Sequence, residues 1–323
     1  MDRARRRSGL LIAAAALALG AAAVPSAPPL KAMRWLAPGA NAARLLTRRP
    51  VECLKAPGDP VQAYLVELGR AAFRDPLLLG GQAARAGLAC ETCHQNGRTN
   101  ANFDFPGLSG RPGTADVTSS MMSSHRGDDV FDPVPIPDLG GPKATLKISQ
   151  APGSDALPHF IHGLVTEEFD GPEPPPAILA GLASYVRALS PAACPAPASE
   201  PVRMEEAMGD ARRAIRAAIA ALAHGDSRSA QVMIQAARSA LGAMAERYAG
   251  PALAPARQSL AVADLDLAAA LAATRGHDPS ATGRLTAWLG RSQAMATGLE
   301  RDAPRSLYNP AAFAAVETPR TGN

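Results

Sequence analysis

The alternation of apolar and polar residues predicts two amphipathic helices in the first two thirds of the chain. Asp59 is a favourable N-cap, Pro60 suits the first helical position, and the apolar positions that follow are spaced three or four apart. One helix is therefore expected from Pro60 to about Phe73, with an apolar face made of Val61, Leu65, Leu68 and Ala72. A second is expected over residues 174–189, with an apolar face made of Ile178, Leu179, Leu182, Tyr185, Val186 and Leu189.

The segments on either side of the second helix have a different character. Residues 95–172 are rich in Gly, Pro, Ser and Asp and have no sustained period, which predicts loops. Beyond residue 200, apolar residues return at helical spacing in four successive runs, separated by short turns at His224-Gly225-Asp226, Gly250-Pro251 and Gly276 to Pro279. Four helices joined by short turns predict an antiparallel four-helix bundle over residues 200–302. Residues 303–323 are expected to be a disordered tail.

The N-terminal segment has the composition of an export signal. An arginine-rich start precedes an apolar run from Gly9 to Val24, and small residues and prolines follow. Residues 1–30 are therefore expected to be a signal peptide, cleaved near Ala21-Ala22-Ala23, or a membrane anchor if cleavage does not occur. The apolar run is short for a membrane span, which favours cleavage. Residues 31–58 are expected to form a linker or an arm over the next domain.

Composition supports an all-α fold and excludes one class of partner. Aromatic residues make up only 4% of the chain, while Ala and Leu dominate the apolar fraction, which favours helices over a β-sandwich. The formal net charge is +4, but most of it comes from the arginines of the leader. No basic stripe interleaved with aromatic residues is present, so a nucleic-acid partner is not expected.

The chemistry of the chain is concentrated in Cys90-Glu91-Thr92-Cys93-His94. This C-x-x-C-H sequence is the attachment signature of a c-type haem, in which the two thiols add to the porphyrin vinyl groups. The histidine that follows becomes the proximal ligand of the iron. A redox C-x-x-C or half of a zinc site are the alternatives, but the βαβ context or second Cys/His pair that they require is absent from the sequence. One covalent haem c is therefore expected on Cys90, Cys93 and His94.

The residues before this motif resemble a known family. The stretch from Leu68 to Pro76, Leu-Gly-Arg-Ala-Ala-Phe-Arg-Asp-Pro, is similar to the "LGRxLFxDPxLS" opening that precedes C-x-x-C-H in the bacterial dihaem cytochrome c peroxidase/MauG family. Leu182-x-x-Tyr185-x-x-x-Leu189 is similar to the C-terminal helix of class I cytochromes c. The resemblance implies a class I cytochrome c-like domain over residues 59–195, in which this helix crosses the first one near Gly69 and Phe73.

The number of haem motifs separates two functions. Enzymes of the dihaem family carry two C-x-x-C-H motifs, whereas this chain has one. We therefore expect an exported, periplasmic monohaem cytochrome that transfers electrons to or from a redox partner protein. A peroxidase-like haem enzyme and a haem-based sensor are the alternatives. No catalytic residue is assigned, because Glu167 and Glu168, the carboxylates available as a distal acid or base, could equally be solvated.

The sixth ligand of the iron decides between these functions, since a carrier needs a strong ligand and an enzyme or sensor needs an open position. His159 and His162 lie one loop before the last helix of the domain, where class I cytochromes place this ligand. Met121 and Met122 have the more common ligand chemistry, and His125 lies beside them. The sequence does not separate these candidates.

Cys53 and Cys194 lie just outside the two ends of the predicted haem domain. In an exported protein, and with the terminal helices crossed, they could form a disulfide; two free thiols are the alternative. The bundle has no further C-x-x-C-H and no Glu-x-x-His pair, so neither a second haem nor a ferritin-like di-iron site is expected in it. We expect the bundle to serve packing or docking.

Overall fold

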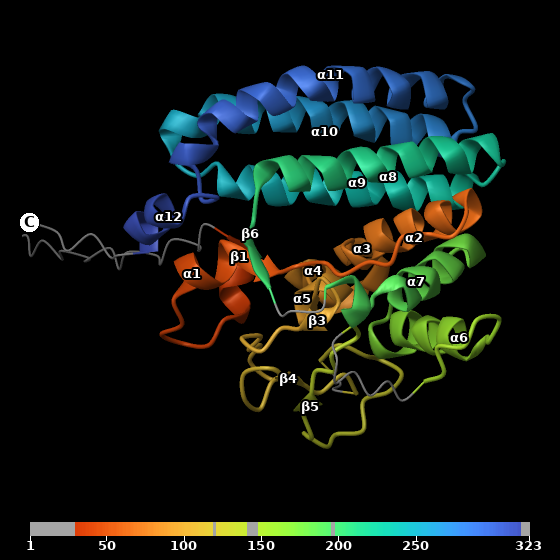
Figure 1. Ribbon diagram of the computed structural model, residues 1–323, viewed down its shortest axis with the longest axis vertical. Coiled ribbons are helices and arrows are strands. Elements are labelled where there is room, and N and C mark those ends of the chain that lie inside the picture. The colour runs from red at the N-terminus through yellow and green to blue at the C-terminus, as the bar shows by residue number, and fades with distance from the viewer. Residues whose placement is uncertain (1–29, 119–120, 141–147, 195–197, 318–323) are drawn as a thin grey trace, which may run out of the picture.

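The computed structural model describes residues 30–118, 121–140, 148–194 and 198–317. Its longer elements are all helices, and its strands are pieces of two or three residues (Figure 1). The predicted all-α class is therefore confirmed. The predicted export signal over residues 1–30 lies, except for Leu30, outside the described residues.

Two helices cross at the centre of the N-terminal half. They are α2 (Pro60–Phe73) and α7 (Pro176–Ala188), close to the two ranges that the sequence predicts. As expected, the side chain of Asp59 caps α2 by accepting a hydrogen bond from the backbone of Gln62, at 2.8 Å. At the crossing, Gly69 and Gly181 bring the two backbones into contact, and a Cβ atom built on Gly181 would lie 2.9 Å from the Gly69 nitrogen.

The chain between these helices folds into short elements. It forms α3 (Pro76–Leu79), α4 (Gly81–Ala86), α5 (Cys90–Cys93), the antiparallel pair β2 (His94–Gln95) and β3 (Arg98–Thr99), and the antiparallel pair β4 (Thr114–Ala115) and β5 (Val134–Pro135). The prediction of loops throughout residues 95–172 is wrong over α6 (Ala156–Gly163) and the π-helix η2 (Leu164–Glu168). Helix α6 is short and packs Leu157 against α7, so tertiary contact stabilises it more than its own sequence does.

The N-terminal arm is firmly packed. It contains the 3₁₀ helix η1 (Lys31–Trp35), α1 (Ala42–Leu46) and β1 (Arg48–Pro50), which pairs antiparallel with β6 (Ser199–Pro201). Trp35 is buried, and Leu36 forms a β-bridge with Phe103. In Figure 1 the arm lies at the left of the lower half of the molecule, and its pairing with β6 connects it to the segment that precedes α8.

Cys53 and Cys194 are joined in a disulfide, with their Cα atoms 5.3 Å apart. Backbone hydrogen bonds support the bridge on one side: the Cys53 carbonyl accepts from the Ser190 nitrogen at 2.8 Å, and the Ala188 carbonyl accepts from the Lys55 nitrogen at 2.9 Å. The disulfide therefore ties the segment that precedes α2 to the segment that follows α7.

Four long helices follow in the described part of the chain. They are α8 (Met204–Ala223), α9 (Ser227–Arg247), α10 (Ala254–Arg275) and α11 (Ser280–Asp302), with the 3₁₀ helix η4 (Pro251–Leu253) before α10. Each packs on the next, and α11 packs back on α8. Two buried hydrogen bonds add specificity to an Ala-, Leu- and Met-rich core, from Trp288 Nε1 to the Ala263 carbonyl at 3.1 Å and from the Tyr248 hydroxyl to the Leu299 carbonyl at 2.9 Å.

The prediction of a disordered tail over residues 303–323 is wrong as far as residue 317. The 3₁₀ helix η5 (Ala303–Arg305) and α12 (Pro310–Glu317) bring Leu307 and Phe313 against α1, where both are buried. The Glu317 carboxylate accepts hydrogen bonds from the first two amides of α1, at 2.8 and 3.0 Å. The burial of Leu307 and Phe313 thus orders a segment whose local composition does not predict a helix. Residues 318–323 lie outside the described part.

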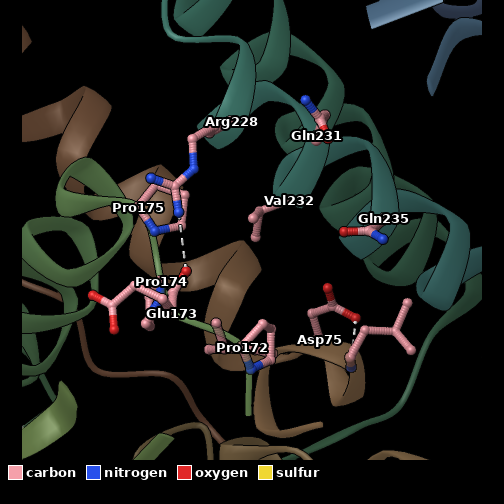
Figure 2. Close-up of a pocket in the computed structure, with 11 residues that line it drawn as sticks. Asp75, Pro172, Glu173, Pro174, Pro175, Arg228, Gln231, Val232 and Gln235 are labelled. Atoms are coloured by element: carbon pink, nitrogen blue, oxygen red, sulfur yellow. Dashed lines mark hydrogen bonds between the residues drawn. The ribbon is translucent and has the colours of Figure 1, made fainter. Parts of the chain in front are cut away.

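The two halves share one hydrophobic core, because α2 packs on both α8 and α9. Asp75, which caps α3, also accepts a hydrogen bond from Ser239 of α9 at 2.9 Å. Burial raises the pKa of Asp75 to about 6. Figure 2 shows this carboxylate at the edge of a cavity of about 170 Å³ between α9 and residues 172–175.

In the part of the chain that the structure describes, every helix is either too short or too polar to span a lipid bilayer.

The close crossing of α2 and α7 predicts a strong effect of one methyl group. A Cβ atom on Gly69 would overlap the carbonyl of Gly181, so Gly69→Ala should destabilise the fold by about 1–3 kcal/mol. Gly283→Ala in α11 is the matched control, because nothing lies within 4 Å of its new methyl group, and it should be neutral or stabilise by up to about 1 kcal/mol. Urea unfolding measures the free energy of unfolding of both variants. Equal changes in the two would contradict the close contact of Gly69 with Gly181.

The disulfide closes a long loop, because its cysteines have a sequence separation of 141. Replacing both Cys53 and Cys194 by Ala should lower the free energy of unfolding by about 5 kcal/mol, because the unfolded chain regains its loop-closure entropy. Chemical denaturation of the variant, and of the native chain with and without a dithiol reductant, measures this difference. If the reductant lowers the free energy of unfolding of the double variant as much as that of the native chain, the loss comes from a group other than this disulfide.

Candidate functional site

Helix α5 presents the two motif cysteines on a single turn. The turn is closed by paired hydrogen bonds between Ala89 and Thr92, with the Ala89 nitrogen donating to Thr92 Oγ1 at 3.0 Å and the Thr92 nitrogen donating to the Ala89 carbonyl at 2.9 Å. Asn100 caps its other end, because its side-chain and backbone nitrogens donate to the carbonyls of Thr92 and Cys93, both at 2.9 Å. Cys90 and Cys93 remain unlinked, half-buried and packed against the core.

A tight hairpin follows the motif at once. Asn96 and Gly97 both have positive φ, at 51° and 77°, which is the backbone of a two-residue type I′ turn between β2 and β3. Glycine and asparagine tolerate this conformation at little cost. The turn brings His94 opposite Thr99 and directs the chain back beneath α5.

The histidine is held in one tautomer. His94 Nδ1 lies 3.0 Å from the Pro137 carbonyl, and a carbonyl can only accept, so Nδ1 carries the proton and Nε2 keeps its lone pair. Burial lowers the pKa of His94 to about 4, although the Pro137 contact and the charge of Asp138 act in the opposite direction. Neutral imidazole with a free Nε2 is the form that binds iron.

The hairpin and the segment that carries Pro137 are joined by several contacts. Arg98 Nε donates to the Asp138 carboxylate at 2.9–3.0 Å, and the Leu139 nitrogen donates to the Gly97 carbonyl at 2.9 Å. Thr99 Oγ1 donates to the Ile136 carbonyl at 3.0 Å. The carbonyl that orients His94 is therefore fixed from both sides.

The thiols of the motif are in an environment that suppresses the free thiolate. Burial raises the pKa of both Cys90 and Cys93 to about 12. Nucleophilic and redox-active cysteines have the opposite property, a lowered pKa beside positive charge. The surroundings of these thiols therefore do not favour thiol–disulfide exchange.

A group of buried charges lies behind the motif, which we call the arginine cluster: Glu52, Arg70, Arg74, Glu91 and Asp210. Arg70 of α2 and Arg74, which directly follows α2, both donate to the Glu52 carboxylate, Arg74 at 2.8 Å. Arg74 also lies 3.7 Å from Glu91 of α5 and reaches within 3.9 Å of Asp210 of α8. The cluster thus connects the arm, the crossing helices, the motif and the C-terminal helices.

The cluster keeps Glu52 ionised. Burial alone would raise the pKa of Glu52, but the charges of Arg74 and Arg70 and the hydrogen bond from the Tyr185 hydroxyl at 2.7 Å lower it to about 2. Tyr185 in turn packs its ring 5.1 Å from that of Phe73, which lies 6.4 Å from the His94 ring.

Four of the candidates for the sixth ligand lie in different environments. Met122 is 1% exposed and belongs to the same apolar core against which Cys90 and Cys93 pack. Met121 is 43% exposed, and His159 is also exposed. His162 Nε2 lies 2.8 Å from the Glu173 carboxylate, so its usual ligand nitrogen is already engaged.

His125 and the two candidate acid/base carboxylates lie on the same face. His125 is exposed, 3.9 Å from Asp170. Glu167 is exposed and pairs with Arg126, whereas Glu168 is buried, which raises its pKa and leaves its Oε2 atom without a partner. Of these two carboxylates, Glu168 has the environment that a proton donor needs, although Arg126 lies 3.6 Å from its Oε1 atom and acts to lower its pKa.

Two cavities border α9, the one in Figure 2 and a second, of about 410 Å³, on the side of α10. Neither is lined by the motif residues. In the described part of the chain, no three His, Cys, Asp or Glu side chains gather closely enough to hold a metal ion by themselves.

Several positions that hold the motif carry no sequence signal. Pro137 orients His94 from 43 residues away, and Glu52 and Asp210 reach the cluster from distant segments. The i, i+4 spacing of Arg70 and Arg74 predicts that they share one face of α2, but not what that face meets.

Comparison with protein-family models, with curated proteins and with solved structures found no match to this chain.

The depressed pKa of Glu52 predicts an acid-sensitive fold. A carboxyl with a pKa of about 2 in the folded state and 4.5 when unfolded stabilises the fold above pH 4.5, and this contribution is lost as the pH falls toward 2. Glu52→Gln should therefore lower the free energy of unfolding by about 3 kcal/mol at pH 7, with a smaller difference at pH 3. Denaturant titrations at both pH values measure this.

Asp266→Asn serves as the control for this prediction. Asp266 forms an exposed ion pair with Arg291, whose loss should change stability by less than about 1 kcal/mol. If Glu52→Gln and the native chain differed equally at pH 7 and pH 3, the ionised cluster would not be the source of the stability.

Proposed function

We propose that this chain is a monohaem c-type cytochrome that transfers electrons, exported to the periplasm. Cys90 and Cys93 would carry the thioether bonds, and His94 would be the proximal ligand. The observation that carries the proposal is the hydrogen bond from His94 Nδ1 to the Pro137 carbonyl, because it leaves Nε2 free to bind iron immediately after a C-x-x-C turn. A haem iron so ligated exchanges one electron between its ferric and ferrous states.

The helix crossing supports the finer fold assignment. We assign residues 59–195 to a class I cytochrome c-like domain, on the basis of the Gly69–Gly181 contact and the packing of Phe73 on Tyr185 on either side of one C-x-x-C-H motif. We assign residues 200–302 to an antiparallel four-helix bundle, because α8 to α11 pack in sequence and α11 returns to α8.

Met122 is the sixth ligand that we propose. It is the named candidate that is fully buried in the apolar core, and a thioether is a common partner of histidine in electron-carrying haems. A histidine–methionine pair leaves the iron without an open position, which suits electron transfer and disfavours peroxide binding.

The disulfide is consistent with export. Disulfides persist in oxidising compartments, and c-type haems are attached on the outer side of the bacterial inner membrane. A redox partner protein is part of the proposal, since a carrier must receive and deliver its electron.

A peroxidase-like enzyme is the second candidate, and Glu168 is the observation that favours it. Its buried carboxyl has a raised pKa and an unpartnered oxygen, as a distal proton donor requires. An enzyme of this kind would need an open iron position.

Spectroscopy of the purified chain tests the proposal. We expect one covalent haem per chain, lost in Cys90→Ser and Cys93→Ser, and a low-spin ferric spectrum that cyanide and peroxide leave unchanged. Met122→Ala should convert the iron to high spin, whereas the neighbouring Met121→Ala should not.

A high-spin native spectrum with rapid peroxide turnover, abolished in Glu168→Gln, would overturn the carrier in favour of the enzyme. Absence of haem would overturn both.

A further inference from the structure

We propose that Asp210 of helix α8 lowers the reduction potential of the haem on Cys90–His94, acting through the arginine cluster and not by contact with the haem. The inference rests on the proposed cytochrome function and assigns a role to the C-terminal helices, namely to supply a charge that tunes the haem.

Asp210 stands where the two halves of the molecule meet. Its carboxylate is bound by Arg213 one turn further along α8, and it lies 3.8 Å from Arg70 Nη2 and 3.9 Å from Arg74 Nε. Only 18% of the Asp210 side chain is exposed, and the side chains of Arg70 and Arg74 are buried to a similar degree. The carboxylate therefore faces these two cations in a region that is largely removed from water.

Arg74 connects Asp210 to the C-x-x-C-H motif through its own contacts. Its Nη2 atom donates to Asn96 Oδ1 at 2.7 Å, and the Asn96 nitrogen donates to both oxygens of Glu91, at 3.0 and 3.1 Å. Asn96 begins the turn that follows His94, and Glu91 lies between the two cysteines. The arginine is therefore in direct contact with the turn and carboxylate that enclose the haem attachment site.

The cluster contains two arginines and three carboxylates. Arg70 and Arg74 face Glu52 and Asp210, with Glu91 beside Arg74. Burial alone would raise the pKa of Asp210, but the neighbouring arginine charges lower it, so the group is ionised at neutral pH. Charges in such a setting act over longer distances than exposed charges, because neither water nor salt screens them fully.

The sign of the effect follows from the charge of the iron. The ferric haem carries one more positive charge than the ferrous haem. Removing the Asp210 carboxylate takes one negative charge from the group behind the motif, which disfavours the ferric state and raises the potential. Native Asp210 therefore holds the potential down, and the haem domain depends on α8 for the balance of its charges.

Three variants of the full-length haem-loaded chain test this inference by spectroelectrochemical titration. Asp210→Asn should shift the potential upward, and the shift should persist at high salt. Asp266→Asn removes the same charge from an exposed pair on α10 and should leave the potential unchanged. Arg213→Gln removes a cation beside Asp210 and should shift the potential downward. If the two variants shift the reduction potential in opposite directions, the effect is one of charge. A general loosening of the structure would not be expected to change the sign of the shift between Asp210→Asn and Arg213→Gln.

The possible failures are distinguishable. A native chain without haem would overturn the proposed function and this inference with it. A native chain that binds haem, with Asp210→Asn and Asp266→Asn at the native potential, would overturn the role of Asp210 alone. If Asp210→Asn does not fold, Arg213→Gln decides: a lowered potential supports the inference, and an unchanged or raised one overturns it.

Discussion

The close backbone contact of Gly69 with Gly181 is the constraint on which the other features depend. Because neither residue has a side chain, α2 and α7 approach closely enough to pack Phe73 on Tyr185 beside His94. The same crossing brings the entrance and exit of the domain together, where Cys53 and Cys194 can bond. It also turns the Arg70 and Arg74 face of α2 toward α8. Core, disulfide and charge cluster thus share one geometric origin.

The arginine cluster is a second organising feature, with a different physical character. Buried arginines and carboxylates cost desolvation free energy, so such a group stabilises a fold only when all its members are paired. Here the partners come from four separate segments: the arm, α2, α5 and α8. Any movement of the C-terminal helices would leave charges unpaired behind the motif. This makes the relative position of the two halves specific, beyond what their shared apolar core requires.

The proposed function and the fold are linked through one histidine. A C-x-x-C-H sequence by itself permits several chemistries, but an imidazole fixed at Nδ1 by a backbone carbonyl can offer only Nε2 to a metal. The buried thiols, whose pKa lies near 12, are poorly suited to thiolate chemistry and compatible with thioether bonds. In the proposed cytochrome, Met122 would close the sixth position of the iron, and in the peroxidase-like alternative Glu168 would act at an open one.

The sequence determined the longer helices and the place of the C-x-x-C-H motif, and the tertiary structure decided which residues contact them. Asp59-Pro60 and the spacing of Val61 to Ala72 suffice for α2, because capping and a helical apolar stripe are local properties. The C-x-x-C-H motif and the four runs beyond residue 200 are equally local.

Helix α6 and residues 303–317 were missed, since burial of Leu157 and Phe313 against distant helices orders them. The partners of His94 and Arg74, namely Pro137, Glu52 and Asp210, come from far along the chain. Only the folded backbone brings them together, because pairings at such separations leave no periodicity in the sequence.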